Sequence, residues 1–455
     1  MAKKQTHDFD LIVIGSGAAG SIAALIAAKA GKRVAMVESN TFGGESPTWS
    51  TIPSKALLHA ANVYDAAKHG APLGLRSAAI GYNYPSLKAW KDLAVRRTGA
   101  QKLETHYASQ GVTVLKGAAH FISPHEITLN RQHLSATHFV VATGGTTPVP
   151  AIEGLKQTGY ITAREAIDLI RPPKSLFIVG GGTTGCEFAE LFSTFGSKVL
   201  IADLEPRLLP KEDTEASSLV EELFTTRRGM EILGSTKVIK VTKEGALKRV
   251  TYQRGGETLS VKVEEVLLAT GRAPNTDIGL ENAGIVYTAD GITVDSELRT
   301  SAKHIYAAGT VIGHQLVHTA LYEGRIAAHN ILNRDKTNAD YTAVPRVTYV
   351  SPELASVGMS EAECLKRDLP IRKGIAPISL VSRSNINNSR DGFVKVMALK
   401  DGTLLGATIM APAAGDMIHE LTLAIQYGIR AHQVANTLHA FPTWSEAIRI
   451  ACSRI

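Results

Sequence analysis

The sequence predicts an α/β fold that contains two nucleotide-binding units of the Rossmann type and ends in a C-terminal α+β region. Three observations predict it. A glycine loop lies between a strand and a helix near the N-terminus, and the same pattern returns about 165 residues later. In the last hundred or so residues, short strands with turn signals precede helices. A chain of 455 residues with 44% hydrophobic and 20% charged residues has the composition of a globular protein of several domains.

The first unit occupies residues 10–38. Leu11–Ile14 is a short apolar strand, and Val34–Val37 predicts a second strand that ends in Glu38. Between them lies a GxGxxG loop with the start of a helix, made of Gly15, Ser16, Gly17, Ala18, Ala19 and Gly20. Such glycines let a pyrophosphate approach the backbone, the helix N-terminus offers N–H groups, and the acid accepts hydrogen bonds from ribose hydroxyls. The unit therefore predicts a dinucleotide site.

The second unit repeats this logic. Phe177–Val179 predicts the strand, residues 186–195 the helix and Lys198–Ala202 the next strand, and the loop glycines are Gly180, Gly182 and Gly185. Two such units in one chain predict that it holds two dinucleotides.

The acid at the end of the second unit, Asp203, bears on the choice of nucleotide. A carboxylate there favours a free 2′-hydroxyl and repels a 2′-phosphate, which predicts NADH rather than NADPH. Arg207 and Arg227 follow in the sequence and keep NADPH as an alternative.

Charge and cysteine content exclude several classes of function. The formal charge of +7 includes no long basic run, so we expect no nucleic-acid partner. The N-terminus lacks an apolar signal core, and the most apolar helical candidate, Ala18–Ala30, is too short to cross a bilayer. We therefore expect a cytoplasmic protein without membrane insertion. Cys186, Cys364 and Cys452 have no metal-ligand spacing, so we expect no metal site and no disulfide framework.

One further stretch, GGESPTWSTIPSKALLHAAN at residues 43–62, connects these units to a known family. Gly43 and Gly44 predict a tight turn, Ser46 a helix cap with a proline after it, and the residues after Pro53 a helix. Together with the two units, this stretch resembles the flavoprotein disulfide reductases, the family of dihydrolipoamide dehydrogenase, glutathione reductase and mercuric reductase. The resemblance implies FAD in the first unit, NADH in the second and a homodimer formed through the C-terminal domain.

The resemblance also implies domain boundaries and cofactor contacts. The expected domains are residues 1–150 for FAD, 151–272 for NAD(P)H, 273–340 for the second part of the FAD domain, and 341–455 for the interface. Besides the residues already named, the resemblance implies cofactor-binding roles for Gly117, Ala119, Ala142, Thr143, Gly144, Gly271, Arg272, Gly309, Thr310, Val317 and His318. Thr310 stands where the family has an aspartate that holds the ribityl chain, and a hydroxyl makes a weaker hydrogen bond than a carboxylate.

Residues expected in the catalytic centre depart from the family pattern. Ser46 and Thr51 stand where the family has its redox-active cysteine pair, and hydroxyls cannot form a disulfide. Phe441 stands where the family has a proton-transferring histidine, whereas Glu446 behind it is retained.

Two further residues match the family. Lys55 and Glu187 match a pair that the family places beside the flavin N5. In the same region Thr183 and Thr184 stand where the family often has a tyrosine over the flavin, which predicts a more open nicotinamide face.

These departures remove dithiol exchange and leave hydride transfer from NADH to FAD. We therefore expect an FAD-dependent NADH:acceptor oxidoreductase that reduces a small molecule such as a quinone, a dye-like acceptor or dioxygen. A catalytically silent homodimer that binds FAD and NAD as a sensor or scaffold is the alternative from another class. A third hypothesis gives Cys452 a redox role as a substitute thiol in a mercuric or disulfide reductase.

Overall fold

The computed structural model describes residues 7–76 and 80–455, which form two compact units. Unit 1 contains the chain up to residue 56 together with residues 86–148 and 271–339, and unit 2 contains residues 57–85, 149–270 and 340–455. The chain therefore leaves and re-enters each unit. The first boundary falls inside helix α3 (Thr51–Lys68), and the four-domain division expected from the sequence stays a prediction.

Unit 1 is organised by a seven-stranded sheet in the order β3-β2-β1-β6-β5-β4, with β18 paired to β6. The pairs that involve β1, β2, β3 and β18 are parallel, whereas β4, β5 and the first half of β6 are antiparallel. The strands are β1 (Phe9–Ile14), β2 (Val34–Glu38), β3 (Val112–Lys116), β4 (Ala119–Ser123), β5 (Glu126–Leu129), β6 (Gln132–Val141) and β18 (Ile305–Ala307). Each strand run predicted from the sequence in this region is present.

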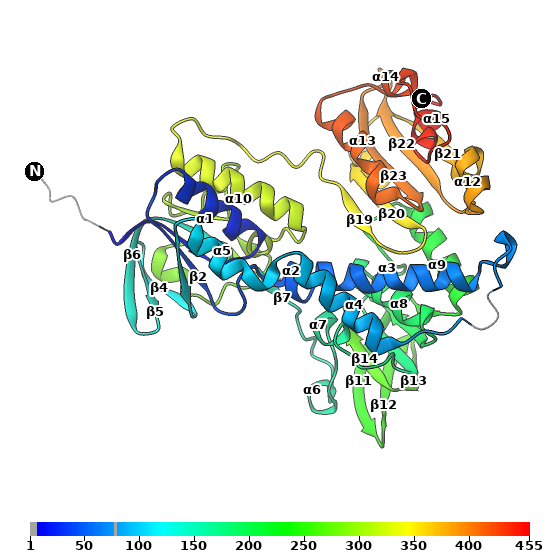
Figure 1. Cartoon of the computed structure of the whole chain (residues 1–455), viewed down its shortest axis with the longest axis horizontal. Coiled ribbons are helices and arrows are strands. Elements are labelled where there is room, and N and C mark those ends of the chain that lie inside the picture. The colour runs from blue at the N-terminus through cyan, green and yellow to red at the C-terminus, as the bar shows by residue number, and fades with distance from the viewer. Residues whose placement is uncertain (1–6, 77–79) are drawn as a thin grey trace, which may run out of the picture. The chain divides into compact units, whose positions relative to one another are not determined.

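Alternation along β1 explains why its sequence is apolar on both faces. Leu11 and Val13 face one hydrophobic core with helices α1 (Ala18–Lys29) and α10 (Val317–Leu332), and Ile12 and Ile14 face a second core with Phe121. Figure 1 shows α1 and α10 side by side. Both helices begin beyond the carboxyl ends of parallel strands, so their N-termini share one edge of the sheet.

The remaining elements of unit 1 are short or peripheral. They are α2 (Glu45–Thr48), α4 (Tyr84–Arg97, whose first two residues fall in unit 2), η2 (Ala100–Lys102), α5 (Leu103–Ser109), β7 (Gly145–Thr146), β15 (Ala273–Pro274), η3 (Leu280–Ala283), β16 (Tyr287–Thr288), β17 (Gly291–Ile292) and η4 (Thr310–Ile312). Strands β7 and β15 pair with each other, and this pair joins two of the three sequence segments of the unit.

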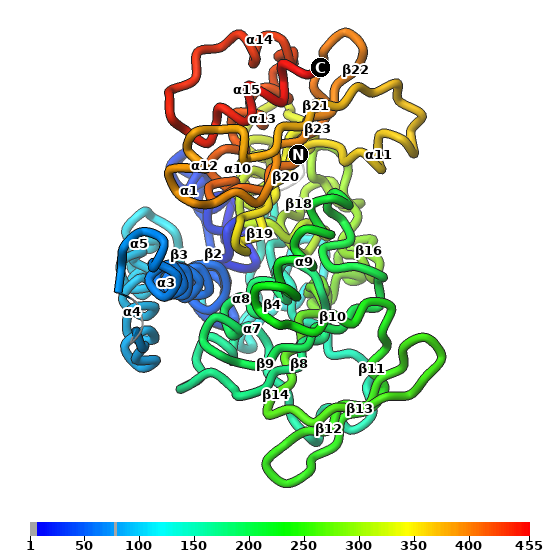
Figure 2. Tube along the Cα trace, turned by 90° about the vertical axis from the view of Figure 1, so that its right-hand side faces the viewer, coloured from blue at the N-terminus to red at the C-terminus, as the bar shows by residue number. Residues whose placement is uncertain are grey.

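Unit 2 begins with a four-stranded parallel sheet in the order β10-β9-β8-β14. A three-stranded antiparallel sheet, β11-β12-β13, lies beside it (Figure 2). The elements are η1 (Ala71–Leu73), α6 (Leu155–Thr158), α7 (Ala163–Ala166), β8 (Ser175–Val179), α8 (Thr183–Thr194), β9 (Lys198–Ala202), α9 (Thr214–Arg228), β10 (Glu231–Leu233), β11 (Thr236–Glu244), β12 (Leu247–Arg254), β13 (Glu257–Val263) and β14 (Glu265–Leu268). The second strand–loop–helix–strand pattern predicted from the sequence corresponds to β8, α8 and β9.

The C-terminal part of unit 2 is a five-stranded antiparallel sheet in the order β19-β20-β23-β22-β21. Its core combines strand residues such as Ile409 with Met417 and Ile448 from the covering helices. The elements are β19 (Arg346–Thr348), β20 (Glu353–Gly358), α11 (Glu361–Lys366), β21 (Ile371–Pro377), η5 (Ile378–Leu380), α12 (Ser382–Asn387), β22 (Phe393–Leu399), β23 (Leu404–Ala411), α13 (Ala414–Gln426), α14 (Ala431–Asn436) and α15 (Glu446–Cys452). This is the α+β region that the sequence predicts.

A buried ion cluster in unit 2 joins β22 to the start of α9 and to α11. Lys395 on β22 is almost fully buried, and its Nζ lies 2.9 Å from Asp213, 2.7 Å from Glu215 and in contact with Glu361. Burial alone would lower the pKa of Lys395, but its hydrogen bonds to the three carboxylates raise that pKa. The cluster therefore holds the protein's own cation among three acids that could otherwise bind a metal ion.

Helix length also bears on membrane insertion. Of the helices in the described residues, none combines the length and the apolar character that a membrane-spanning segment needs.

Candidate dinucleotide and redox sites

The first and third glycines of the loop in unit 1 are required by the fold itself. Gly15 has a φ of +101°, and a Cβ there would lie 2.2 Å from the carbonyl oxygen of Ala142. A Cβ at Gly20 would lie 1.9 Å from the carbonyl oxygen of Gly15. Both positions exclude any side chain because the backbone packs against them.

Gly17, the middle glycine, has a different environment. Its φ of −63° suits any residue, and a Cβ there would meet no described atom within 4 Å. Open space therefore adjoins Gly17 at the N-terminus of α1, where Ala18 and Ala19 form the first residues of the helix. The N–H groups of a helix start suit a pyrophosphate, so the missing side chain leaves room for a dinucleotide.

Glu38 is fixed beside this loop by three donors. One carboxylate oxygen accepts from the N–H of Ser16 at 2.9 Å and from its hydroxyl at 2.7 Å, and the other accepts from the N–H of Asn40 at 2.7 Å. The Ser16 hydroxyl in turn accepts from the N–H of Gly43 at 3.0 Å. The predicted ribose-binding acid and the predicted turn at residues 43–44 are thus parts of one hydrogen-bonded assembly.

The turn at Gly43 and Gly44 packs directly on the loop, since a Cβ at Gly44 would lie 2.8 Å from the Cα of Gly17. One prediction here is wrong: the cap of the following helix α2 is Gly44 and not Ser46, which lies in the first helical turn. The positive φ of Gly44, +71°, lets the chain turn into the helix two residues earlier than a cap at Ser46 would.

Ser46 and Thr51 lie on either side of a break between helices. Helix α2 ends at Thr48, the backbone of Trp49 is extended in φ at −143°, and α3 begins at Thr51. Both hydroxyl residues are half-buried. Lys55 lies on the first part of α3. The helix predicted after Pro53 starts at Thr51, three residues earlier than expected.

Hydrogen bonds connect two sequence segments of unit 1, residues 143–145 and residues 272–275. Thr143 donates its hydroxyl to the carbonyl of Asn275 at 2.7 Å, and Asn275 returns two bonds, from its side chain to Thr143 O at 2.9 Å and from its N–H to Gly144 O at 3.0 Å. Arg272 donates to the Gly145 carbonyl and pairs with Glu45 at 2.6 Å. Sequence reasoning missed this role of Glu45, because no local pattern links the two positions.

The other expected cofactor residues of unit 1 lie at strand ends and helix starts. The N–H of Gly117 donates to the Glu38 carbonyl at 2.9 Å, and Ala119 is buried at the start of β4. Ala142 follows β6 and donates its N–H to Ile14 O at 2.8 Å. Gly309 and Thr310 follow β18 along the chain, and Val317 and His318 begin α10. Whether they touch a cofactor stays a prediction.

The loop in unit 2 repeats the geometry of the first. A Cβ at Gly180 would lie 2.3 Å from Ala269 O, and one at Gly185 would lie 2.0 Å from Gly180 O. Gly182 has a φ of −75°, and a Cβ there would find open space out to 4 Å in the described part of the chain. We call the open space beside Gly17 at the start of α1 the first cradle, and the equivalent space beside Gly182 at the start of α8 the second cradle. Gly271 ends this region with a φ of +85°.

Asp203 and the nearby arginines define the polar side of the second cradle. Asp203 accepts from the N–H groups of Gly181 at 2.5 Å and Glu205 at 2.8 Å. The guanidinium of Arg207 donates to the carbonyls of residues 210 and 212 at 3.1–3.2 Å. Arg227 forms an ion pair with Asp391. Both arginines therefore have partners other than a nucleotide phosphate.

Glu187 and Thr183 on α8 contact the end of β19. Glu187 is buried and accepts from the N–H of Tyr349 at 3.2 Å, and the hydroxyls of Thr183 and Thr348 lie 3.0 Å apart. Sequence reasoning missed Thr348 and Tyr349, because strand residues distant in sequence carry no motif. The pairing of Lys55 with Glu187 stays a prediction.

The C-terminal segment contains Phe441 and Glu446. Phe441 is 72% exposed, and Glu446 begins α15 and accepts from the N–H of Thr443 at 3.3 Å. Two residues before the phenylalanine, the side chain of His439 is nearly buried, with one ring nitrogen 2.9 Å from Glu420 and the other 2.8 Å from the carbonyl of Thr437. His439 carries no motif of its own, but its place two residues before Phe441 is a signal in the sequence.

Two family descriptions match the chain. Pyridine nucleotide-disulphide oxidoreductase matches residues 9–324, and the dimerisation domain of the same family matches residues 344–452. The chain belongs to the pyridine nucleotide-disulphide oxidoreductase family. Members of this family are flavin-dependent oxidoreductases that bind FAD and NAD(P), and the match to the dimerisation domain supports a homodimer.

Relatives of the chain in this family include enzymes with different acceptors. A mercuric reductase of Staphylococcus aureus is 32% identical over 448 residues, which cover 98% of this chain and 82% of the relative. A dihydrolipoyl dehydrogenase of Bacillus subtilis is 34% identical over 446 residues, which cover 96% and 94%. Among solved structures, the Cu(II) complex of the HOCl-induced flavoprotein disulfide reductase RclA from Escherichia coli superposes with a TM-score of 0.87 at 26% identity and covers 98% of this chain and 99% of that one.

All three cysteines of this family member are unpaired and buried in unit 2. Burial raises the pKa of Cys186 well above its usual value and raises that of Cys364. Burial and the charge of Glu420 raise the pKa of Cys452 to about 12. Because the thiolate is the reactive form, these three side chains are poor nucleophiles at neutral pH.

Proposed function

We propose that this chain is an FAD-dependent NADH:acceptor oxidoreductase that works without a redox disulfide. The observation that carries the proposal is the pair of middle glycines, Gly17 and Gly182. The fold itself gives no reason for either to lack a side chain, and each adjoins open space at a helix start next to a fixed carboxylate. Two dinucleotides account for both glycines.

In the first cradle we assign the pyrophosphate of FAD to the start of α1 and its ribose to Glu38. Gly43 and Gly44 would let the flavin approach the backbone, and Thr310 and the start of α10 would bind the ribityl chain and the pyrimidine edge. Bound FAD would accept a hydride from NADH and pass the electrons to the acceptor. The positive end of the α10 dipole at Val317 and His318 would stabilise negative charge on a reduced ring.

In the second cradle we assign NADH rather than NADPH. The carboxylate of Asp203 would face a 2′-phosphate on the bound nucleotide, and like charges repel. Arg207 and Arg227, which could have offset that repulsion, are bound to backbone carbonyls and to Asp391. Lys55 and Glu187 would position the nicotinamide, and the small Thr183 would leave its face open.

The proposed class of electron acceptor follows from two groups that the site lacks, a redox disulfide and a proton-transferring histidine. Ser46 and Thr51 cannot form a disulfide, Phe441 cannot transfer a proton, and Glu446 alone does not replace a histidine. A planar apolar acceptor such as a quinone or a dye would need only a pocket in which it contacts the reduced flavin. Dioxygen is smaller and would need less space. The Hg(II) and Cu(II) ions in the names of the relatives add metal ions to the acceptors to be tested.

The test is anaerobic stopped-flow absorbance of the purified protein mixed with NADH, and in a separate run with NADPH. Rapid bleaching of the flavin band by NADH, and much slower bleaching by NADPH, is the expected result. Quinones, dyes, dioxygen, Hg(II) and Cu(II) are then compared by the rate at which the colour returns. If neither NADH nor NADPH bleaches the bound FAD, this proposal is wrong, and the chain is instead a catalytically silent dimer that binds nucleotides.

Cys452→Ser serves as the matched control for thiol chemistry. The proposal predicts unchanged rates in both half-reactions for this variant. Loss of acceptor reduction in Cys452→Ser would instead support a reductase that uses this thiol.

A further inference from the structure

A turn between β18 and α10, residues 309–314, is held at both ends by one carboxylate. Glu323 on the second turn of α10 is completely buried. Its Oε2 accepts from the N–H of Gly309 at 2.6 Å, and its Oε1 contacts Nδ1 of His314. Because these two partners are the first and last residues of the turn, a single side chain links its two ends, in addition to the backbone bonds inside the turn. Hydrogen bonds to an ionised carboxylate are stronger than neutral ones.

The turn lies against the first cradle. A Cβ at Gly309 would touch the Cβ atoms of Ala19 and Ala320, each at 3.5 Å, and a Cβ at Gly324 would lie 2.3 Å from the carbonyl oxygen of Ala19. Ala19 belongs to the first turn of α1, which begins directly after Gly17. Glu323 therefore lies next to the close contact between α10 and the first turn of α1.

We infer that Glu323 and His314 are positioning residues for FAD. They fix the turn that carries Thr310, the residue that stands where the resemblance expects an aspartate. A hydroxyl binds the ribityl chain less strongly than a carboxylate. A turn that is already ordered before binding costs less conformational entropy when the cofactor enters, which offsets part of that loss. This inference rests on the FAD site proposed above.

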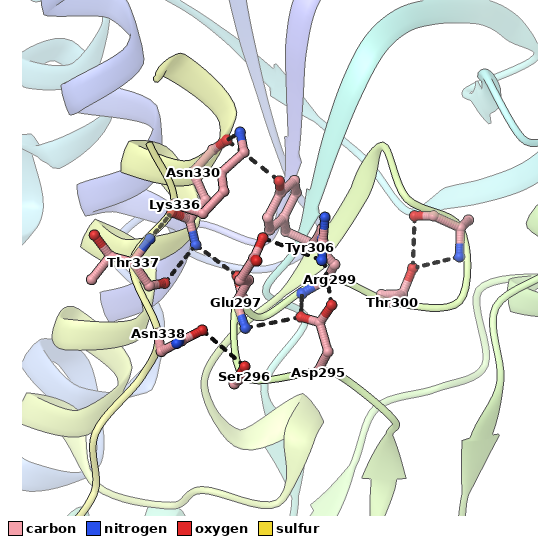
Figure 3. Close-up of polar contacts among 11 residues, drawn as sticks. Asp295, Ser296, Glu297, Arg299, Thr300, Tyr306, Asn330, Lys336, Thr337 and Asn338 are labelled. Carbon is pink, nitrogen blue, oxygen red and sulfur yellow. Dashed lines mark hydrogen bonds and ion pairs between the residues drawn. The ribbon is translucent and has the colours of Figure 1, made fainter. Parts of the chain in front are cut away.

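The other end of α10 provides an independent anchor and hence a control. Figure 3 shows Asn330 at this end, with hydrogen bonds to Glu297 and Thr337, which lie on two other segments of the chain. Its side-chain nitrogen donates to the carbonyls of Glu297 and Thr337, each at 2.9 Å, and its oxygen accepts from the N–H of Thr337 at 2.8 Å. Lys336 also donates to the carbonyl of Asn330. These contacts hold the same helix without touching residues 309–314.

The experiment measures the Kd for FAD by titrating the flavin-free full-length chain and following quenching of flavin fluorescence. The melting temperature of each flavin-free variant is recorded in parallel. Glu323→Gln removes the charge and is expected to weaken FAD about tenfold or more, the effect of losing one hydrogen bond to a charged group. His314→Leu removes the ring donor and is expected to weaken FAD in the same direction. His314→Asn places an amide N–H near the position of Nδ1 and is expected to restore affinity close to that of the unaltered chain.

Asn330→Ala separates positioning from general loosening of α10. We expect it to lower the melting temperature while the Kd for FAD stays within about twofold. Equal losses of FAD affinity in Asn330→Ala and Glu323→Gln would overturn the inference, as would normal affinity in His314→Leu. Failure of the unaltered chain to bind FAD would instead refute the proposed function, so the two failures are distinguishable.

Discussion

Replacing Gly17 with alanine should separate cofactor binding from folding. The native φ of −63° and the open space around the added methyl group impose no strain on the flavin-free protein. Alanine reduces the entropy of the unfolded chain, worth about 0.4–1 kcal/mol of stability, but is a poorer helix cap than glycine by about 1 kcal/mol. These effects oppose each other, so the unfolding free energy of the flavin-free chain should change by less than about 1 kcal/mol.

Binding should respond much more strongly than stability. The methyl group occupies the space assigned to the pyrophosphate and keeps it from the N–H groups of α1. Loss of one or two hydrogen bonds to a charged group, about 1.5–3 kcal/mol each, corresponds to a weakening of FAD binding of about tenfold to about twenty-thousandfold. The assay is titration with FAD alongside urea unfolding of the flavin-free chain.

Two control variants complete this experiment. Gly15→Ala places its Cβ 2.2 Å from a carbonyl oxygen at a φ of +101°, so it should lose several kcal/mol of stability as well as binding. Gly182→Ala should abolish bleaching by NADH and leave FAD affinity unchanged. Full FAD affinity in Gly17→Ala, or a loss of stability as large as that in Gly15→Ala, would refute the reasoning.

Three further predictions concern unit 2 and the histidines. Lys395→Met leaves three clustered carboxylates without their cation and should cost about 3–5 kcal/mol in urea unfolding, against less than about 1 kcal/mol for the more exposed Lys373→Met. Burial lowers the pKa values of His138 and His304, so the folded state binds fewer protons than the unfolded state. Stability should therefore be full above about pH 6.5 and fall as the pH decreases below it, and His304→Gln should flatten that fall in an acid titration followed by circular dichroism. Cys452 should resist thiol-labelling reagents at pH 8 until the protein is unfolded, which mass spectrometry would show.

Local patterns predicted those parts of the fold in which neighbouring residues determine the geometry. Both glycine loops, the strands before them and the acids after them follow from short-range sequence, because each pattern requires a tight turn between a buried strand and a helix. The helix cap at Ser46 was wrong because the tertiary packing of Gly44 on Gly17 moved the helix start. Partners that are distant in sequence, such as Glu45 with Arg272 or Glu323 with Gly309, carry no local signal and became visible only in the structure.

The anchors around residues 43–45 explain how Ser46 and Thr51 can be held without a covalent link. In a disulfide reductase the bond between two cysteines itself constrains the segment that contains them. In this chain, the N–H of Gly43 donates to Ser16, and Glu45 pairs with Arg272 immediately before the first hydroxyl. The first anchor connects the segment to Ser16, which also fixes Glu38, and the second connects it to Arg272, which donates to the carbonyl of Gly145. The segment is therefore held through Gly43 and Glu45 by residues from two other parts of the chain, and these contacts do not need a bond between residues 46 and 51.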